Sequence, residues 1–455
     1  MTKLTSIKLE GEVEIPNDKS ITHRAILFSS IANGTSKIRF HSIGRDNLAS
    51  LRVMRQLGAD VTGSLSSKVY ELAKLEGVVQ SMAQWSKDYS EIIVSGKGLH
   101  SLAAAGEVLD CGNSGTTSRL MCGILAGQKF KATITGDESL KSRPFKRITD
   151  PLSQMGAVFS SDNLPITISG ASLKPIEYVS PKASAQVKSA IFLAGLYAQV
   201  PCTVIESSLS RNHTELMLDS MGVEVKSFQQ LDSSWKITSS LKGELSPLEI
   251  EIPGDFSAAA FFMVAASIIP ESKILIKNVG FNSSRTGLFD ILKKMGANIN
   301  PVEKRKVGGE EVVDLMVSHS DLNGIKIDAK EVVKAIDEIP ILAVAAAFAN
   351  GVTEVSGASE LRVKESDRIK MIVELLMSYG VDIEEKADGF IIKGSNFIEP
   401  KQMDSWKKCH DHRIFMSHAV LNLAFNSKIE LLEKETVETS FPGFLEQFQS
   451  LMKAA

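Results

Sequence analysis

The sequence predicts an α/β protein of two domains, and three observations lead to that prediction. The chain has 455 residues, which exceeds the usual size of a single hydrophobic core. A short strand, a polar loop and an Ala/Leu-rich helix recur in that order, most clearly as VEIPNDKSITHRAILFSS and IEIPGDFSAAAFFMVAAS. A second recurring segment is an amphipathic helix that ends on glycine and leads into a strand. Such internal repetition predicts two domains of three repeats each.

The strand–loop–helix segment has four looser copies, which are LDCGNSGTTSRLMCGILAG, SPKASAQVKSAIFLAGLYA, DEIPILAVAAAFANG and HDHRIFMSHAVLNLAF. The two closest copies, EVEIPNDKS and EIEIPGDFS, mark corresponding points of the two halves. We therefore expect the chain to cross between domains near Pro16 and Pro253. One domain is then discontinuous, with residues 1–16 and 253–455, and residues 17–252 form the inserted domain.

The second segment occurs as LRVMRQLGADV, PLSQMGAVF, LDSMGVEV, LKKMGANI and LLMSYGVDI. Each ends its helix on a glycine, at the position where a left-handed residue commonly stops a helix. These glycines are Gly58, Gly156, Gly222, Gly296 and Gly380.

Composition excludes several classes of function. The formal net charge of -3 gives no basis for a nucleic-acid partner. The four cysteines form no CxxC pair, which is typical of reduced thiols and not of a disulfide framework or zinc site. The N-terminal segment lacks the apolar core of a secretion signal, and the apolar run at residues 339–349 is too short for a membrane span. We expect a cytoplasmic protein without a metal.

Polar loops at the starts of the helices are candidate binding sites. A helix N-terminus offers free N–H groups and a partial positive charge, which favour anions. Each loop alone also fits a simple helix cap, but several together predict a strongly anionic ligand. The loop residues are Lys19, Ser20, Arg24, Asn113, Ser114, Gly115, Thr116, Thr117, Ser184, Gln186, Asp411 and Arg413.

Arginine and lysine supply further cations in GDESLKSRPFKR, SRNHTE, NSSRTG and LRVKESDR. Arginine suits carboxylate and phosphate because its planar fork makes paired charge-assisted bonds. In RVKESDR the spacing predicts Lys364 and Arg368 on one helix face, with Glu365 beside them. A helical salt-bridge ladder without any function is the alternative for this segment.

Eight motifs carry a resemblance over nearly the whole chain. They are PNDKSITHR, NSGTTSRLMCGILAG, GDESLKSRPFKR, SAQVKSAIFLAGLYA, SRNHTE, DEIPILAVAAAFA, LRVKESDRI and DHRIFMS. In this order they resemble the 5-enolpyruvylshikimate-3-phosphate (EPSP) synthase family, and its second class in particular. The resemblance implies a two-domain inverse α/β barrel-like fold, with three βαβαββ units per domain and the active site in the cleft between the domains.

The resemblance also implies the reaction. The enolpyruvyl group of phosphoenolpyruvate passes to the 5-hydroxyl of shikimate 3-phosphate and phosphate is released, a step of the shikimate pathway to aromatic amino acids. The family is usually monomeric and needs no cofactor.

The family's functional residues carry over position by position. Asp337 is the implied base, and it also fits a cap of the helix that follows it. Glu365 and Lys364 are implied for proton delivery, and Lys19 contacts both substrates. The residues implied for shikimate 3-phosphate are Lys19, Ser20, Arg24, Ser184, Gln186, Asp337 and Lys364. Those implied for phosphoenolpyruvate are Lys19, Gly115, Arg143, Gln186, Arg368 and Arg413.

Some positions depart from family patterns. Asn17 stands where glycine is usual, which predicts a strained backbone. Thr439 stands where many relatives have lysine, which removes a cation from the phosphoenolpyruvate side. Gly115 stands where glyphosate-tolerant second-class relatives often have alanine, which predicts sensitivity to glyphosate.

Three other readings compete. UDP-N-acetylglucosamine enolpyruvyl transferase shares fold and donor, but that family carries a cysteine in the loop that here reads GDESLKSRPFKR. RNA 3'-phosphate cyclase has a related architecture, but no nucleophilic histidine is evident. A non-catalytic descendant that only binds anions has no need of the acid and base at Glu365 and Asp337.

Overall fold

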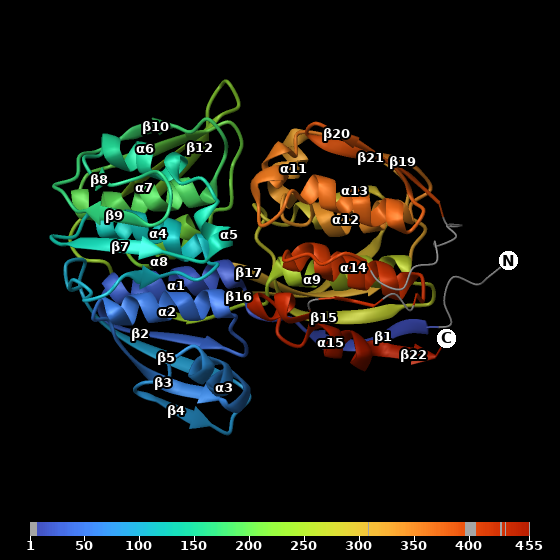
Figure 1. Ribbon diagram of the computed structural model, residues 1–455, viewed down its shortest axis with the longest axis horizontal. Coiled ribbons are helices and arrows are strands. Elements are labelled where there is room, and N and C mark those ends of the chain that lie inside the picture. Colours follow the sequence, from blue (N-terminus) through green and yellow to red (C-terminus); the bar gives the residue numbers. More distant parts are fainter. Residues whose placement is uncertain (1–6, 308, 396–405, 428–429, 433, 455) are drawn as a thin grey trace. The chain divides into compact units, whose positions relative to one another are not determined.

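The computed structural model describes residues 7–307, 309–395, 406–427, 430–432 and 434–454, without the side chains of residues 438 and 439. The chain forms two compact units. Unit 1 comprises Met1–Pro16, Pro253–Lys306 and Glu310–Ala455, and unit 2 comprises Asn17–Ile252 and Val307–Gly309. Both contain helices packed on mixed sheets, so the predicted α/β class is confirmed (Figure 1).

Unit 2 alternates helices and strands. Its helices are α1 (Lys19–Ile31), α2 (Arg45–Gln56), α3 (Ser67–Leu75), α4 (Gly115–Ala126), α5 (Glu138–Lys141), α6 (Lys146–Gln154), α7 (Ala185–Ala198) and α8 (His213–Ser220). Its strands are β2 (Asn33–Phe40), β3 (Asp60–Ser66), β4 (Met82–Trp85), β5 (Ser90–Lys97), β6 (Leu109–Asp110), β7 (Lys131–Thr135), β8 (Val158–Phe159), β9 (Ile166–Ser169), β10 (Glu177–Val179), β11 (Cys202–Glu206), β12 (Glu224–Gln229), β13 (Trp235–Ser240) and β14 (Glu249–Glu251).

Unit 1 is built in the same way. Its helices are α9 (Phe256–Ile268), α10 (Gly287–Lys294), α11 (Ala329–Ala335), α12 (Ile339–Ala347), α13 (Arg368–Ser378), α14 (His412–Ala424) and α15 (Phe444–Leu451), with 3-10 turns η1 (Ser359–Val363) and η2 (Lys434–Thr439). Its strands are β1 (Ile7–Glu14), β15 (Lys273–Gly280), β16 (Asn298–Val307), β17 (Glu310–Ser318), β18 (Lys326–Ile327), β19 (Gly351–Val355), β20 (Asp382–Lys386), β21 (Gly389–Gly394) and β22 (Met452–Ala454).

The sheets repeat one topology. Sheets β6-β7-β9-β8, β10-β11-β13-β12 and β18-β19-β21-β20 share the same order. In each, the first two strands in the chain are parallel neighbours, and the last strand pairs antiparallel with the second. This strand order is that of the βαβαββ unit that the family resemblance implies.

The first strand of two repeats is exchanged. Strand β1 precedes α1 in the chain but pairs in parallel with β15, and β14 precedes α9 but pairs in parallel with β2. The chain therefore leaves each sheet directly after its exchanged strand. At the two crossings Asp255 N donates to Pro16 O over 2.8 Å, and the Asn17 amide donates to Ile252 O.

The predicted helix-ending glycines all adopt left-handed φ values between +88° and +111°. At Gly58 the helix ends with the bonds Gly58 N to Arg55 O (2.9 Å) and Ala59 N to Met54 O (2.9 Å), and the other four ends repeat this pattern. A side chain would strain this conformation, which explains why glycine recurs there. Asn17, by contrast, does not have a positive φ, so the prediction of strain there was wrong. Its side-chain oxygen instead accepts from His41 N and Ser42 N.

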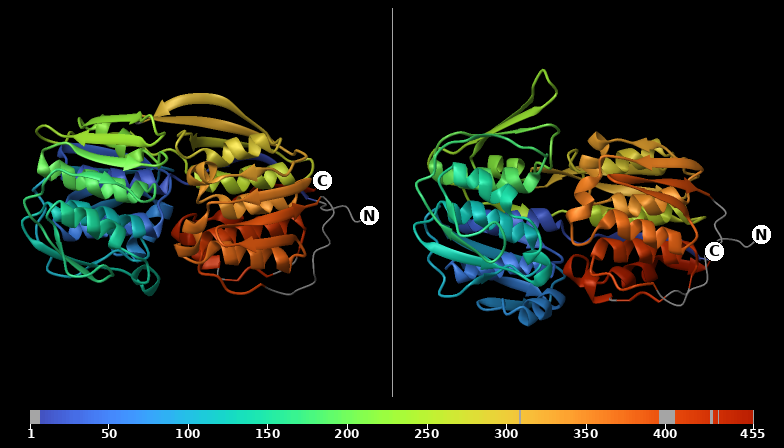
Figure 2. Two further views of the ribbon diagram at one scale, coloured as in Figure 1. Left: turned by 90° about the horizontal axis from the view of Figure 1, so that it is seen from above. Right: turned by 45° about the horizontal axis from the view of Figure 1, so that its top comes forward.

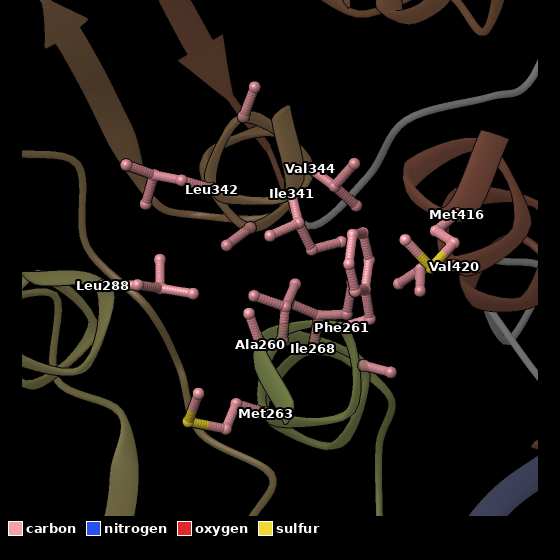
Figure 3. Close-up of a cluster of buried hydrophobic side chains, with 14 of the residues drawn as sticks. Ala260, Phe261, Met263, Ile268, Leu288, Ile341, Leu342, Val344, Met416 and Val420 are labelled. Atoms are coloured by element: carbon pink, nitrogen blue, oxygen red, sulfur yellow. The ribbon is translucent and has the colours of Figure 1, made fainter. Parts of the chain in front are cut away.

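Each unit has its own core, and in each unit the sheets lie outside the central helices (Figure 2). In unit 1 every residue of α9 and α12 is buried, which explains why these helices are apolar on all sides. Figure 3 shows Phe261 of α9 between α12 and α14, with Ile341 on one side and Met416 on the other. Among the described residues, no helix combines the length and apolar character needed to cross a membrane.

Candidate functional site: helix N-termini and their cations

Three buried helices of unit 2 begin at loops that the sequence identified as candidate anion sites. Asp18 caps α1 by accepting from Ile21 N over 2.9 Å, and Ser114 caps α4 by accepting from Thr117 N over 3.1 Å. Ser184 precedes α7 but makes no side-chain capping bond. The helices α4 and α7 pack against each other, and α4 also contacts α1. Unit 2 therefore gathers three ends with positive dipole character.

Arg24 joins the first of these helices to α7 and α8. Its guanidinium donates to Thr214 Oγ1 over 2.7 Å, to Ser189 Oγ over 3.0 Å and to Ser20 O over 3.0 Å. Only 4% of Arg24 is exposed. The bonds fix a planar cation beside the first turn of α1, which also carries Lys19. The Lys19 ammonium lies 3.0 Å from Asp46 Oδ2.

Gly115 lies at the first position of α4, between two arginines. Arg119 Nη1 donates to Gln186 Oε1 over 2.8 Å, which connects α4 to the first turn of α7. Arg143 Nη2 donates to Asn113 Oδ1 over 2.7 Å. A methyl group at Gly115 would stand 2.8 Å from Arg119 Nη1 and 3.3 Å from Arg143 Nη1. The absence of a side chain there leaves both guanidinium groups close to the helix end.

A chain of hydroxyl groups supports the start of α4. Ser114 Oγ lies 2.7 Å from Thr117 Oγ1, which lies 2.7 Å from Ser50 Oγ, and this hydroxyl lies 2.7 Å from His23 Nδ1. Burial, together with the charges of Lys19 and Arg24, holds the pKa of His23 well below its ordinary value. The imidazole is therefore neutral and acts as a hydrogen-bonding element of the scaffold.

In unit 1, cations surround Asp337 at the start of α12. Lys364 Nζ lies 3.7 Å and Arg368 Nη1 3.4 Å from Asp337 Oδ1, and Arg413 Nη2 lies 3.9 Å from Asp337 Oδ2. Arg413 Nη1 also donates to the backbone oxygen of Asp337 over 2.9 Å. The alternative that Asp337 caps the helix was wrong, because Glu338 occupies the N-cap position.

Arg368 is almost fully buried among carboxylates. Its Nε donates to Asp411 Oδ2 over 2.8 Å, and its Nη2 contacts Glu365. Burial alone would lower the pKa of Arg368, but the carboxylates, Asp411 foremost, outweigh it and raise the pKa. Burial likewise opposes ionisation of Asp411, yet Arg368 holds the pKa of that carboxyl below its ordinary value. Each therefore favours the charged form of the other.

The prediction that Lys364 and Arg368 share a helix face was wrong. The 3-10 turn η1 ends at Val363, and α13 begins only at Arg368, capped by Asp367, whose side chain accepts from Lys370 N. Lys364 has an extended backbone between the two. Both side chains nevertheless reach Asp337.

The start of α9 is closed by an internal ion pair. Arg285 Nη2 donates to Asp255 Oδ1 over 2.6 Å and to Ser257 Oγ over 2.9 Å, and Ser257 in turn donates to Glu338. In the aligned repeats PNDKS and PGDFS, Phe256 stands in the place of Lys19. The loop before α1 therefore carries a lysine at this position, whereas the loop before α9 carries a phenylalanine.

The structure places the predicted site residues in two sets, one in each unit. Lys19, Ser20, Arg24, Gly115, Arg143, Ser184 and Gln186 lie at helix starts or in loops of unit 2. Asp337, Lys364, Glu365, Arg368 and Arg413 lie together in unit 1. Thr439 lies outside the residues whose side chains are described.

Sequence reasoning missed Arg119 and Lys188, each the only charged residue in its helix (α4 and α7), and Glu338, which directly precedes an apolar run. A lone charge in or beside an apolar helix was the available signal.

Known proteins resemble this chain over nearly its whole length. The family model described as EPSP synthase (3-phosphoshikimate 1-carboxyvinyltransferase) matches residues 4–448. A 3-phosphoshikimate 1-carboxyvinyltransferase from a Sulfurihydrogenibium species is 42% identical over 450 residues, covering 98% of both chains. One from Thermodesulfovibrio yellowstonii is 43% identical over 450 residues, again covering 98% of both chains.

Solved structures are similar in fold. An EPSP synthase from Acinetobacter baumannii superposes with a TM-score of 0.80 at 38% identity, covering 98% of this chain and 97% of its own. The enolpyruvyl transferase NikO from Streptomyces tendae has a TM-score of 0.71 at 13% identity, covering 98% of this chain and 96% of its own, and this likeness concerns the fold alone. The predicted enolpyruvyl transferase fold is confirmed.

Proposed function

Because this chain belongs to the EPSP synthase family, we propose that its two sets of cations and helix ends bind shikimate 3-phosphate and phosphoenolpyruvate for enolpyruvyl transfer. The enzyme is a 3-phosphoshikimate 1-carboxyvinyltransferase. The observation that supports the proposal best is that cations gather at helix starts in both units, where phosphate and carboxylate groups are favoured.

In unit 2 we assign shikimate 3-phosphate to Lys19, Ser20, Arg24, Ser184 and Gln186. Arg24 suits a carboxylate because its planar guanidinium is already fixed in orientation by its bonds to Thr214 and Ser189. Gly115, Arg143 and Gln186 are assigned to phosphoenolpyruvate, and Lys19 is assigned to both substrates. Arg119 supports this set through its bond to Gln186.

In unit 1 Asp337 is the proposed base. It takes the proton of the 5-hydroxyl of shikimate 3-phosphate as the oxygen attacks C2 of phosphoenolpyruvate. Lys364 helps to hold shikimate 3-phosphate. Glu365 with Lys364 delivers a proton to the methylene carbon, which becomes a methyl group. Arg368 and Arg413 balance the charge of phosphoenolpyruvate. In the second step the C2–O bond to phosphate breaks and the methyl group loses a proton, which regenerates the double bond.

The proposal requires no change of oxidation state, so it includes no redox cofactor. We further propose that the protein acts as a monomer in the cytoplasm.

Phosphate release from phosphoenolpyruvate by the purified protein tests the assignment. Shikimate 3-phosphate and UDP-N-acetylglucosamine are offered separately as acceptors, and we expect release only with the first. Release only with the nucleotide sugar would replace this function by that of the related transferase. No release with either, but binding of shikimate 3-phosphate, would leave a non-catalytic binder.

A further inference from the structure

Unit 2 contains a buried charge cluster next to Ser184 and Arg24 that the proposed reaction does not use. Lys188 Nζ lies 3.0 Å from Glu206 Oε2 and 2.7 Å from Glu215 Oε1, and the three side chains are 0%, 0% and 7% exposed. Burial would lower the pKa of Lys188, but Glu215 and Glu206 together outweigh it and raise the pKa. The lysine therefore stays charged inside the unit.

Glu206 ties three chain segments together. Its Oε1 accepts from Ser184 N over 3.0 Å, and its Oε2 accepts from Ser210 N over 3.2 Å and from Lys188 Nζ. Ser210 Oγ donates to both carboxylate oxygens, over 2.8 Å and 2.9 Å. The end of β11 is thus joined to the start of α7 and to the segment before α8. Glu206 thus holds the backbone N–H of Ser184, whose own hydroxyl makes no bond that caps α7.

The same cluster adjoins the groups that orient Arg24. Ser189 follows Lys188 in α7, and Thr214 precedes Glu215 in α8. These two hydroxyl groups lie 2.5 Å apart, and each accepts a bond from the guanidinium of Arg24. Lys188 and Glu215 therefore each stand next in the chain to an acceptor of Arg24.

Stability does not account for three charges at this place. Buried ion clusters gain little over well-packed apolar side chains of similar volume, because desolvation offsets their attraction. We propose that Lys188, Glu206 and Glu215 are positioning residues, which hold Ser184 and the acceptors of Arg24 in the geometry that binds shikimate 3-phosphate. This inference rests on the proposed function of the site.

The variant Glu206→Gln tests it with little change in volume. The carboxylate accepts from every partner named above, whereas the amide NH2 would face donors such as Lys188 Nζ or Ser210 N. We expect the KM for shikimate 3-phosphate to rise about tenfold, as for a small misplacement of binding groups, while the KM for phosphoenolpyruvate stays unchanged. The matched control is Glu177→Gln, which removes an exposed carboxylate 2.8 Å from Lys236 Nζ in the same sheet.

A second variant separates positioning from stability. The variant Lys188→Met/Glu206→Gln/Glu215→Gln removes all three charges of the cluster, so we expect a melting temperature near that of the wild type. The KM for shikimate 3-phosphate should stay raised. A KM for shikimate 3-phosphate that returns to the wild-type value would overturn the inference. The three charges would then only neutralise one another and would not position Ser184 or Arg24.

The outcomes remain distinguishable from failure of the proposed function. If the triple variant does not fold, Glu206→Gln decides alone, and an unchanged KM for shikimate 3-phosphate in that variant refutes positioning. Titration calorimetry with shikimate 3-phosphate gives the same ranking without turnover. A wild-type protein that neither binds nor converts shikimate 3-phosphate refutes the function itself.

Discussion

Replacing Gly115 by alanine tests whether the proposed phosphoenolpyruvate-binding residues of unit 2 require the space that this glycine leaves beside Arg119. The new methyl group would stand 2.8 Å from Arg119 Nη1, whereas ordinary contact begins at 3.4 Å, so the guanidinium has to withdraw by about 0.6 Å. Its 2.8 Å bond to Gln186 Oε1 then lengthens toward about 3.4 Å, beyond the usual range for an N–H···O bond. Arg143, at 3.3 Å from the methyl group, needs to move much less.

The expected effect follows from that one bond. Without that bond Gln186 is no longer held in place for phosphoenolpyruvate, and we expect the KM for phosphoenolpyruvate to rise about tenfold or more, as for a small misplacement of binding groups. The φ of Gly115 is not positive, so alanine fits the backbone, and the free energy of unfolding should fall by no more than about 1.5–3 kcal/mol, the contribution of one hydrogen bond to a charged group. Steady-state kinetics with each substrate varied in turn, together with thermal unfolding, measure both effects. An unchanged KM for phosphoenolpyruvate, or a rise confined to shikimate 3-phosphate, would refute the reasoning.

Three further predictions concern the charges and the inhibitor. Arg413→Ala should lower kcat/KM about a hundredfold or more, as for loss of a preorganised electrostatic donor, whereas Lys393→Ala on an exposed hairpin should not; near-wild-type turnover of the first variant would contradict the assignment. Burial holds the pKa of His418 at about 4, below the ordinary 6.5, so the unfolded chain takes up the proton first. The free energy of unfolding should therefore fall by up to about 3 kcal/mol from pH 6.5 to pH 4. In His418→Gln, the free energy of unfolding measured with urea should no longer show this part of its dependence on pH. An equal pH dependence in the variant and the wild type would disprove the link to His418. Glyphosate should inhibit the wild type because Gly115 leaves room beside both arginines; an inhibition constant in the high-millimolar range would argue against this.

The repeats made the architecture predictable. The five glycines at helix ends required left-handed backbone, and each is found there, because only glycine adopts that conformation without strain. The helix starts were predictable from Asp18 and Ser114, whose side chains cap their helices locally. Signals of this kind depend only on neighbouring residues in the chain, so they can be recognised in the sequence without knowledge of the fold.

The site was less predictable because its contacts join distant segments. Spacing alone placed Lys364 and Arg368 on one helix, but the extended backbone at Lys364 separates them. Arg368 and Asp411 are 43 residues apart in the chain, and nothing in either segment indicates their pairing. Similarly, PNDKS and PGDFS predict equivalent loops, whereas Arg285 from a different segment closes only the second.

Binding of shikimate 3-phosphate to two arginine variants tests the central assignment most directly. Titration calorimetry without phosphoenolpyruvate compares Arg24→Ala in unit 2 with Arg413→Ala in unit 1. We expect Arg24→Ala to lose measurable affinity for shikimate 3-phosphate and Arg413→Ala to keep it. Retained affinity in Arg24→Ala, with loss in Arg413→Ala, would contradict the assignment of the two substrates to these groups.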